Sequence, residues 1–361
     1  MTTRVFNFSS GPAVLPVPVL ERAQRDLVAL PGVGMSVLEI SHRSPTFESI
    51  LKKTEADLRR LASIPPQYRL LFLQGGASMQ FSMVPMNLLQ PGQTADYVVT
   101  GSWGEKAAKE ARKVGHVHVA GSSQATGFDR IPADDELKFT PGAAYVHITS
   151  NNTIEGTQWK RLPQVGDTPL VSDASSDIFS EPIDVARFGL IYAGAQKNLG
   201  PAGVTLVIIR EDLLERSSKS LPTMLNYAVH AENSSLYNTP PVFAIYVVGL
   251  VAEWLLENGG LEAMAERNRR KAAKLYAELD RTGFWKPTAQ AESRSLMNVT
   301  FRLESEELEK RFVKEAAAEG LDGLKGHRSV GGMRASIYNA FPEEGVDALV
   351  SFMREFERRN G

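Results

Sequence analysis

Short runs of consecutive apolar residues, each bounded by glycine, proline or polar turn residues, recur through the first two hundred positions of the chain. Such runs, rich in β-branched residues, are typical of buried strands. They predict strands at residues 69–73, 96–99, 116–120, 143–149, 169–173, 190–193 and 204–209. The last two runs flank a turn-rich segment, 194–203, which contains a single lysine.

Between and after these runs the apolar residues return every three or four positions, which predicts amphipathic helices. The first helix is expected from about Val17 to Leu30, where Pro31-Gly32 would stop it. Further helices are expected near residues 47–61, 78–89, 106–113, 242–257, 261–280, 305–319 and 343–358. Strands that alternate with helices over this length indicate an α/β fold with a largely parallel sheet.

The pattern changes near residue 257, which indicates a second domain. Strands are expected at 297–302 and 333–338, among helices, as in a smaller α+β domain. We therefore expect a large domain at 16–256 and a small C-terminal domain at 257–361, with residues 1–15 packing near the small one.

Composition narrows the class of protein. The chain has 361 residues, 43% of them hydrophobic, and a net charge of −2, so bulk charge does not indicate a nucleic-acid partner. It contains no cysteine, which excludes disulfides and thiolate nucleophiles. The first residues lack the apolar core of a signal peptide, and the apolar stretch 246–256 is too short to span a bilayer. We expect a soluble, cytoplasmic protein without a membrane partner.

Lys197 is the most distinctive residue, because it lies between two predicted buried strands. Burial lowers the pKa of an amine and frees it for Schiff-base chemistry. The alternative is a lysine whose stem packs on the sheet while its ammonium reaches water. The local sequence favours neither.

Several other candidates share the same kind of position. Gly75, Trp103, Thr153, Asp173 and Lys197 all follow predicted strands of one sheet. Ligands of open α/β sheets bind outside the carboxyl ends of the strands, so these residues are expected to converge.

Each candidate also has a structural interpretation. Gly75-Gly76-Ala77-Ser78 could bind a phosphate at a helix start or form a plain tight turn. Asp173 could hold a protonated ring nitrogen, or pair with Lys197, or cap a helix. Trp103 could stack on a planar ligand or belong to the core.

Arginine and histidine residues in polar loops indicate an acidic substrate. Two His-Arg pairs, His42-Arg43 and His327-Arg328, lie in such loops, and Arg334 begins a late strand. Arginine binds carboxylate and phosphate through two parallel hydrogen bonds. Ordinary surface basicity is the alternative for each single pair. The six histidines show no metal-ligand spacing beyond His116 and His118, so no metal is expected.

Five motifs together resemble the phosphoserine aminotransferase family over essentially the whole chain. They are Phe6-Asn7-Phe8-Ser9-Ser10-Gly11-Pro12-Ala13, Ser41-His42-Arg43, Tyr192-Ala193-Gly194-Ala195-Gln196-Lys197-Asn198, Tyr237-Asn238-Thr239-Pro240-Pro241, and Lys325-Gly326-His327-Arg328 through Gly331-Gly332-Met333-Arg334-Ala335-Ser336. The resemblance implies fold type I, pyridoxal 5′-phosphate (PLP) as cofactor and a homodimer. It implies amino transfer between glutamate/2-oxoglutarate and phosphoserine/3-phosphohydroxypyruvate, with a further role in vitamin B6 synthesis.

The same resemblance implies roles for cofactor-binding residues. Lys197 would carry the cofactor as a Schiff base, and Asp173 would pair with its pyridine nitrogen. Trp103 would stack on the ring and Thr153 would contact its phenolic side. The cofactor phosphate would be held by Ala77, Ser78 and Gln196, joined from the other subunit by Asn238 and Thr239. Some members carry Gly-Arg where this chain has Ala77-Ser78.

Substrate-binding residues are implied as well. Arg334 would anchor the α-carboxylate, and Ser10 would line the substrate site. The distal phosphate or carboxylate would be bound by His42, Arg43, His327 and Arg328. Two other functions stay open: another fold-type-I PLP aminotransferase or lyase acting on a small acidic amino acid, and a non-catalytic α/β binding protein.

Overall fold

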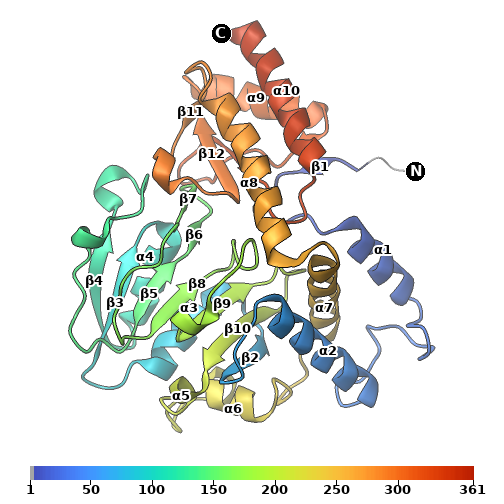
Figure 1. Ribbon diagram of the computed structural model, residues 1–361, viewed down its shortest axis with the longest axis vertical. Helices are drawn as coiled ribbons and strands as arrows, with labels where there is room; N and C mark the ends of the chain where they lie inside the picture. The colour runs from blue at the N-terminus through green and yellow to red at the C-terminus, as the bar shows by residue number, and fades with distance from the viewer. Residues whose placement is uncertain (1–3) are drawn as a thin grey trace.

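The computed structural model describes residues 4–361, and a seven-stranded sheet forms its centre (Figure 1). Only β10 runs antiparallel to its neighbours, β2 and β9, while the remaining pairs are parallel. The predicted, largely parallel sheet is thus confirmed. In spatial order the strands are β2 (Tyr68–Leu73), β10 (Thr205–Arg210), β9 (Leu190–Gly194), β8 (Leu170–Asp173), β5 (Val146–Thr149), β3 (Thr94–Val99) and β4 (His116–Ser122).

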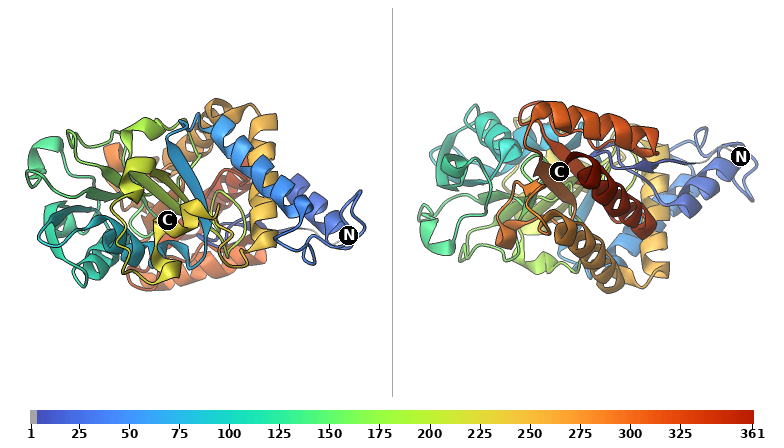
Figure 2. Two further views of the ribbon diagram at one scale, coloured as in Figure 1. Left: turned by 90° about the horizontal axis from the view of Figure 1, so that it is seen from below. Right: turned by 90° about the horizontal axis from the view of Figure 1, so that it is seen from above.

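Helices cover both faces of this sheet, and each face has its own apolar core (Figures 1 and 2). One core includes residues of α1 (Val17–Asp26), α2 (Pro45–Leu61) and α7 (Val242–Glu257). The other includes residues of α3 (Gly76–Leu88) and α4 (Ser102–Ala111), and the short helices α5 (Glu211–Leu214) and α6 (Tyr227–Glu232) adjoin it.

The alternation of side chains along β8 determines which residues reach which face. Leu170 belongs to the core beneath α2 and α7, whereas Val171 belongs to the core beneath α3 and α4. Successive side chains of a strand point to opposite faces, so Ser172 lies on the same face as Leu170, and Asp173 lies on the same face as Val171. The catalytic candidate Asp173 therefore ends the strand on the α3 side.

The C-terminal part has a separate antiparallel sheet of β11 (Lys286–Pro287), β12 (Asn298–Arg302) and β14 (Met333–Ser336). Its core unites this sheet with helices and with Phe8 of the N-terminal segment. The division at residue 257 stays a prediction, and residues 1–3 of the predicted N-terminal segment lie outside the described residues. The remaining elements here are α8 (Gly260–Leu279), α9 (Glu306–Ala318), α10 (Glu343–Asn360), and the paired strands β1 (Phe6–Asn7) and β13 (Leu321–Asp322).

The first helix ends earlier than predicted, at Asp26 rather than Leu30. The Asp26 carboxylate is 1% exposed and accepts a hydrogen bond from the Tyr246 hydroxyl of α7. The chain then turns, and the Leu30 N–H donates to the Met35 carbonyl. A contact with a residue 220 positions away sets this boundary, and no local signal announces it.

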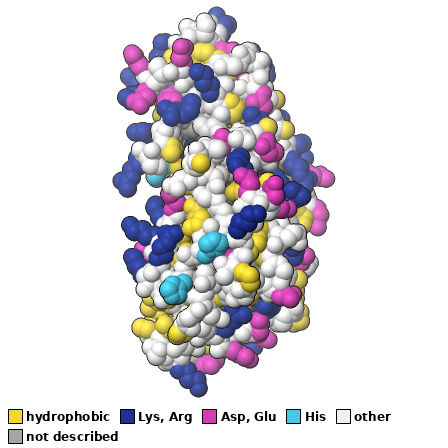
Figure 3. All heavy atoms as spheres, turned by 90° about the vertical axis from the view of Figure 1, so that its left-hand side faces the viewer, with side chains coloured by type: hydrophobic (Ala, Val, Ile, Leu, Met, Phe, Trp, Pro, Cys, Tyr) yellow, Lys and Arg dark blue, Asp and Glu magenta, His cyan; other side chains and the backbone are white. Residues whose placement is uncertain are grey.

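Two surface findings bear on partners. Within residues 4–361 no single helix is long and apolar enough to cross a membrane; α7 and α8 meet that criterion only when joined across an 84° bend. The edge strand β4 carries His116 and His118, and on the face that it borders basic and acidic side chains are interspersed (Figure 3).

Candidate active site

A cavity of about 260 Å³ lies at the carboxyl ends of β8 and β9, where Asp173 and Lys197 meet. This is the expected place for a ligand of an open α/β sheet. Most of the predicted site residues line it together, although they come from segments far apart in the chain. They are Ser10, Ala77, Ser78, Trp103, Thr153, Asp173, Gln196, Lys197, His327 and Arg334.

Lys197 lies in the connection between the antiparallel strands β9 and β10, and its backbone is held firmly. The Ala195 N–H donates to the Val204 carbonyl at 3.0 Å, and the Gly200 N–H donates to the Ala195 carbonyl at 2.8 Å. The stem of Lys197 packs on Gly11, where an added Cβ would lie 3.5 Å from Lys197 Cγ. Burial lowers the pKa of Lys197 to about 8, and the Asp173 charge opposes part of that shift.

The Asp173 carboxyl is 5% exposed, and both of its hydrogen bonds go to one oxygen. Oδ1 accepts from the Ser175 N–H at 3.0 Å and from the Ser175 hydroxyl at 2.6 Å. Within residues 4–361 the other oxygen has no hydrogen-bond partner. Burial raises the pKa of Asp173. A cationic group in the cavity would restore the carboxylate, because an opposite charge favours the ionised form.

Trp103, at the start of α4, is fixed from several sides. Its Nε1–H donates to Thr153 Oγ1 at 3.0 Å, and the Lys106 ammonium lies 4.1 Å from the ring centroid. The preceding Ser102 donates its N–H and hydroxyl to Glu155 Oε1, at 2.8 and 2.7 Å. Since the Thr153 oxygen accepts from Trp103, its own proton is free to donate into the cavity.

The first turn of α3 supplies backbone donors. The helix begins after Gly75, which adopts φ 86°, and Ala77 and Ser78 follow in that turn. The N–H groups of a first helical turn have no partner inside the helix, so they suit a phosphate. Gln196 folds back over Gly194, where an added Cβ would lie 2.7 Å from Gln196 Oε1. The absent Cβ therefore leaves room for the Gln196 amide beside the cavity.

Arg334 of β14 joins the two parts of the chain at the cavity. Its guanidinium donates to the Thr153 carbonyl at 2.8 Å and to Ser10 Oγ at 2.7 Å. The Tyr338 hydroxyl donates to the Ser10 carbonyl at 2.8 Å, which fixes the N-terminal segment as well. His327 also faces the cavity, and burial, followed by the charge of Arg334, lowers its pKa.

Five predicted residues lie outside this cavity in the single chain. His42 and Arg43 precede α2, and Arg328 lines an adjoining opening. Asn238 and Thr239 lie beside Gln74, whose side-chain amide donates to the Thr239 carbonyl at 3.3 Å. The roles assigned to these residues, and to those inside the cavity, stay predictions.

Other residues line the cavity that the sequence did not single out, among them Gly11, Phe81, Asn151, Ser175 and Ser176. Ser175 had a local signal, because an aspartate two residues before a serine is typical of a hydrogen-bonded turn. No local sequence signal placed Gly11 at the cavity. Its position depends on the N-terminal segment crossing over Gln196, where the Ala13 N–H donates to the Gln196 carbonyl at 2.8 Å.

These features fit PLP. The amine of Lys197, with its lowered pKa, matches the aldehyde of PLP, and the open carboxylate oxygen of Asp173 matches its ring nitrogen. The fixed indole of Trp103 matches the ring face, and the free N–H groups at the start of α3 match the phosphate.

Comparison with known proteins gives the same answer. The model of the family "Aminotransferase class-V" matches residues 5–349. A phosphoserine aminotransferase of Geobacillus kaustophilus is 58% identical over 359 residues, covering 99% of both chains. The structure of the phosphoserine aminotransferase of Bacillus circulans subsp. alkalophilus superposes with a TM-score of 0.98 at 54% identity, covering 100% of both chains. The PLP-bound phosphoserine aminotransferase of Trichomonas vaginalis gives 0.93 at 40% identity, with coverages of 97% and 100%.

The fold and the site thus define a PLP-dependent aminotransferase of fold type I. The relative from Geobacillus kaustophilus and the structure from Bacillus circulans cover 99% and 100% of this chain at 58% and 54% identity. The chain belongs to the class-V aminotransferases and, among them, to the phosphoserine aminotransferase family.

Proposed function

We propose that the enzyme transfers an amino group reversibly between glutamate and 3-phosphohydroxypyruvate, yielding 2-oxoglutarate and phosphoserine. The observation that carries this proposal is that Arg334 and His327 face the same cavity as Lys197 and Asp173. Glutamate and phosphoserine are both short amino acids with a distal anion, so one set of cationic side chains suits both.

The cofactor residues are proposed from the geometry above. When bound, PLP accepts the electron pair released as the substrate Cα–H bond breaks. Ala77, Ser78 and Gln196 would hold its phosphate, Trp103 would cover its ring, and Thr153 would donate to its phenolic oxygen. Ala77-Ser78 offers backbone N–H groups and one hydroxyl, without the charge of an arginine.

Lys197 and Asp173 then divide the proton chemistry. Asp173 would hold a proton on the pyridine nitrogen through its open carboxylate oxygen, which is the oxygen left free by Ser175. The Lys197 amine would take the proton from the substrate Cα and later return one, as general base and then acid. A pKa of about 8 suits both steps near neutral pH.

Substrate anchoring follows from Arg334. Its fork is already oriented by the Thr153 carbonyl and Ser10 Oγ, and we assign it the α-carboxylate. Ser10 would line the same end of the site. His42, Arg43, His327 and Arg328 would bind the distal phosphate or carboxylate.

A homodimer would bring the predicted residues that lie outside the single-chain cavity to a catalytic cavity. Asn238 and Thr239 would then reach the cofactor phosphate of the other subunit. Tyr237 and Met79 support this assignment, because they are 48% and 40% exposed although apolar, and they flank Thr239 and the start of α3. Mixing Asn238→Asp chains with Lys197→Ala chains tests it, since complementation requires sites built from two subunits.

Three further assignments belong to the same proposal. Serine synthesis in the cytoplasm is the cellular role, with 4-phosphohydroxythreonine of the vitamin B6 route as a second substrate. We keep the proposed domain boundary between residues 256 and 257, and the bend between α7 and α8 close to it supports this division.

The decisive experiment incubates the PLP-loaded enzyme with glutamate and 3-phosphohydroxypyruvate and measures phosphoserine. Absence of turnover, with activity on another keto acid, would favour a different aminotransferase or a lyase for a small acidic amino acid. A preparation that cannot be loaded with PLP would favour a binding protein.

A further inference from the structure

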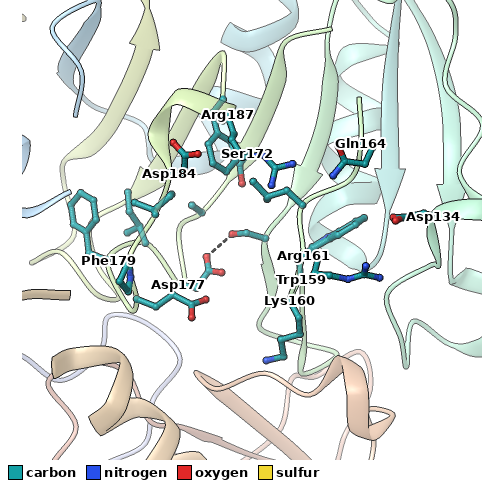
Figure 4. Close-up of a pocket in the computed structure, with 18 residues that line it drawn as sticks. Asp134, Trp159, Lys160, Arg161, Gln164, Ser172, Asp177, Phe179, Asp184 and Arg187 are labelled. Carbon is teal, nitrogen blue, oxygen red and sulfur yellow. Dashed lines mark hydrogen bonds between the residues drawn. The ribbon is translucent and has the colours of Figure 1, made fainter. Parts of the chain in front are cut away.

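A second cavity, of about 450 Å³, lies on the other face of the sheet (Figure 4). Ser172 of β8 lines it, whereas the adjacent Asp173 lines the catalytic cavity. The remaining wall comes from Asp134, Ser150 and Ala174 and from the segments 159–164 and 177–188, so none of the proposed cofactor or substrate residues takes part. Its volume falls within the range of about 300–1,000 Å³ that is usual for small-molecule sites.

Among residues 4–361, two buried polar atoms of this cavity have no hydrogen-bond partner. They are Ser172 Oγ and Trp159 Nε1, in side chains that are 1% and 7% exposed. An unpaired buried donor or hydroxyl costs about 1–3 kcal/mol. Apolar residues that include Ile178, Phe179 and Phe188 line the same cavity. The pairing of an apolar wall with a few polar atoms is typical of a site for an organic molecule.

Charged side chains of both signs surround the cavity. Lys160, Arg161 and Arg187 are basic, while Asp177, Glu181 and Asp184 are acidic. Within residues 4–361 none of these six side chains takes part in an ion pair. Opposite charges that converge without pairing leave room for a ligand that carries both signs.

Asp177 and Lys160 are two of the charged residues that line the cavity. Figure 4 shows the Asp177 carboxylate pointing inward, with Ser172 above it and Lys160 below. Asp177 is held by neutral groups, the Ser150 hydroxyl at 2.5 Å and the Gln158 amide at 3.3 Å. Lys160 donates to Gln158 Oε1 at 3.3 Å. Gln158 therefore lies between the two charges and keeps them apart.

We propose that this cavity is a second binding site for a free α-amino acid with an aromatic or branched apolar side chain. Its ammonium group pairs with Asp177, its carboxylate pairs with Lys160, and its side chain packs on Trp159, Ile178 and Phe179. The catalytic cavity, by contrast, is proposed to take amino acids with a distal anion.

Ser150 connects the site to the backbone of Asp173. Its N–H donates to the Asp173 carbonyl at 2.9 Å, and its hydroxyl lies within hydrogen-bond distance of both that carbonyl, at 3.0 Å, and Asp177. A hydroxyl has one proton, so it donates to only one of them at a time. An ammonium that keeps Asp177 ionised draws the Ser150 proton away from the Asp173 backbone.

Calorimetric titration of the PLP-loaded enzyme tests the site. The probes are L-phenylalanine, phenethylamine, which lacks the carboxylate, and 3-phenylpropionate, which lacks the ammonium. L-phenylalanine is expected to bind at one site per chain, and each truncated analogue at least tenfold more weakly.

Two variants assign the charges. Lys160→Met is expected to weaken L-phenylalanine binding at least tenfold without changing phenethylamine binding. Asp177→Asn is expected to weaken it equally without changing 3-phenylpropionate binding. Lys160 is exposed and Asn is isosteric with Asp, so both variants should fold. Lys109→Met, an exposed lysine of α4 on the opposite face, is the matched control and should bind like the unaltered enzyme.

Two results would overturn the proposal. One is that L-phenylalanine gives no binding heat. The other is that it binds equally well to the enzyme and to both variants, which would place it in the catalytic cavity or elsewhere.

Discussion

Ser172 and Asp173 are consecutive residues of β8, yet their side chains line two different cavities on opposite faces of the sheet. Asp173 is fixed by Ser175 and faces Lys197, whereas Ser172 Oγ has no hydrogen-bond partner in the part of the chain that the structure describes. One short strand thus separates the catalytic cavity from the second site. Variants of residues in one cavity can therefore be distinguished from variants of residues in the other.

Lys197→Ala should lower kcat for the proposed transamination by at least about a thousandfold, because it removes the proton carrier. The fold should persist, since the backbone bonds of the 195–204 connection do not involve the side chain. Turnover and circular dichroism measure the two effects. Lys109→Ala is the control, and substantial residual turnover in Lys197→Ala would refute the assigned role.

Asp173→Asn should reduce kcat/KM about a hundredfold, which corresponds to about 2.7 kcal/mol. The amide oxygen can still accept both bonds from Ser175, but the negative charge that would hold the ring proton is lost. Ser175→Ala, which keeps the charge and removes one hydrogen bond, should cost about tenfold or less. Steady-state kinetics compare kcat/KM of the two variants. An equal loss of kcat/KM in both would mean that the negative charge of Asp173 does not account for the effect.

Trp103→Phe should weaken PLP retention while conserving most of the turnover of the loaded enzyme. The ring remains, but the Nε1–H bond to Thr153 at 3.0 Å disappears. One hydrogen bond is worth about 0.5–1.5 kcal/mol, so the Kd of PLP should rise about two- to tenfold. Equilibrium dialysis measures this Kd. An unchanged Kd would show that Thr153 is positioned without Trp103.

Arg334→Lys should raise KM for glutamate and for phosphoserine alike, by about tenfold or more, because both share the α-carboxylate. A lysine cannot keep the fork that donates to the Thr153 carbonyl and Ser10 Oγ at once. Ser10→Ala leaves the guanidinium in place and should change KM less. A rise in KM for only one substrate would assign Arg334 to the distal anion instead.

Asp177→Asn should alter how stability depends on pH. Burial raises the pKa of Asp177 from 3.8 to about 7, so between these values the folded chain binds the proton more tightly than the unfolded chain. The stability of the unaltered protein therefore falls as pH rises through that window, whereas the amide does not titrate. The Tm of the variant minus that of the parent should increase from about pH 4.5 to about pH 7.5. Calorimetry at several pH values measures it, and a constant difference would contradict the shift.

Much of the sheet and of the catalytic cavity could be predicted from the sequence, because both depend on local patterns. Apolar runs marked the strands, and Asp173 and Lys197 each follow such a run. A parallel sheet brings strand ends to one edge, so their convergence needed no further information. The family resemblance then added Ser10 and gave Arg334, already a candidate, its role at the α-carboxylate; the two lie in other segments but meet at 2.7 Å.

What the sequence could not predict depends on contacts between distant segments. The end of α1 depends on Tyr246, and the place of Gly11 depends on the crossing of the N-terminal segment over Gln196. The second cavity was also missed. Lys160, Asp177 and Ser172 come from separate segments with no shared motif, and only folding brings them together.

The antiparallel pair of β9 and β10 has a mechanical consequence. The segment that carries Lys197 leaves the sheet and re-enters it beside the same strand, and its ends are joined by the Ala195–Val204 hydrogen bond. A backbone restrained at both ends cannot follow the amine, so the reach of Lys197 Nζ is set by its side-chain torsions alone. Variants that loosen this hairpin should therefore make the position of the Lys197 amine less defined when it delivers the proton. We expect the stereochemical selectivity of transamination to decrease before its rate does.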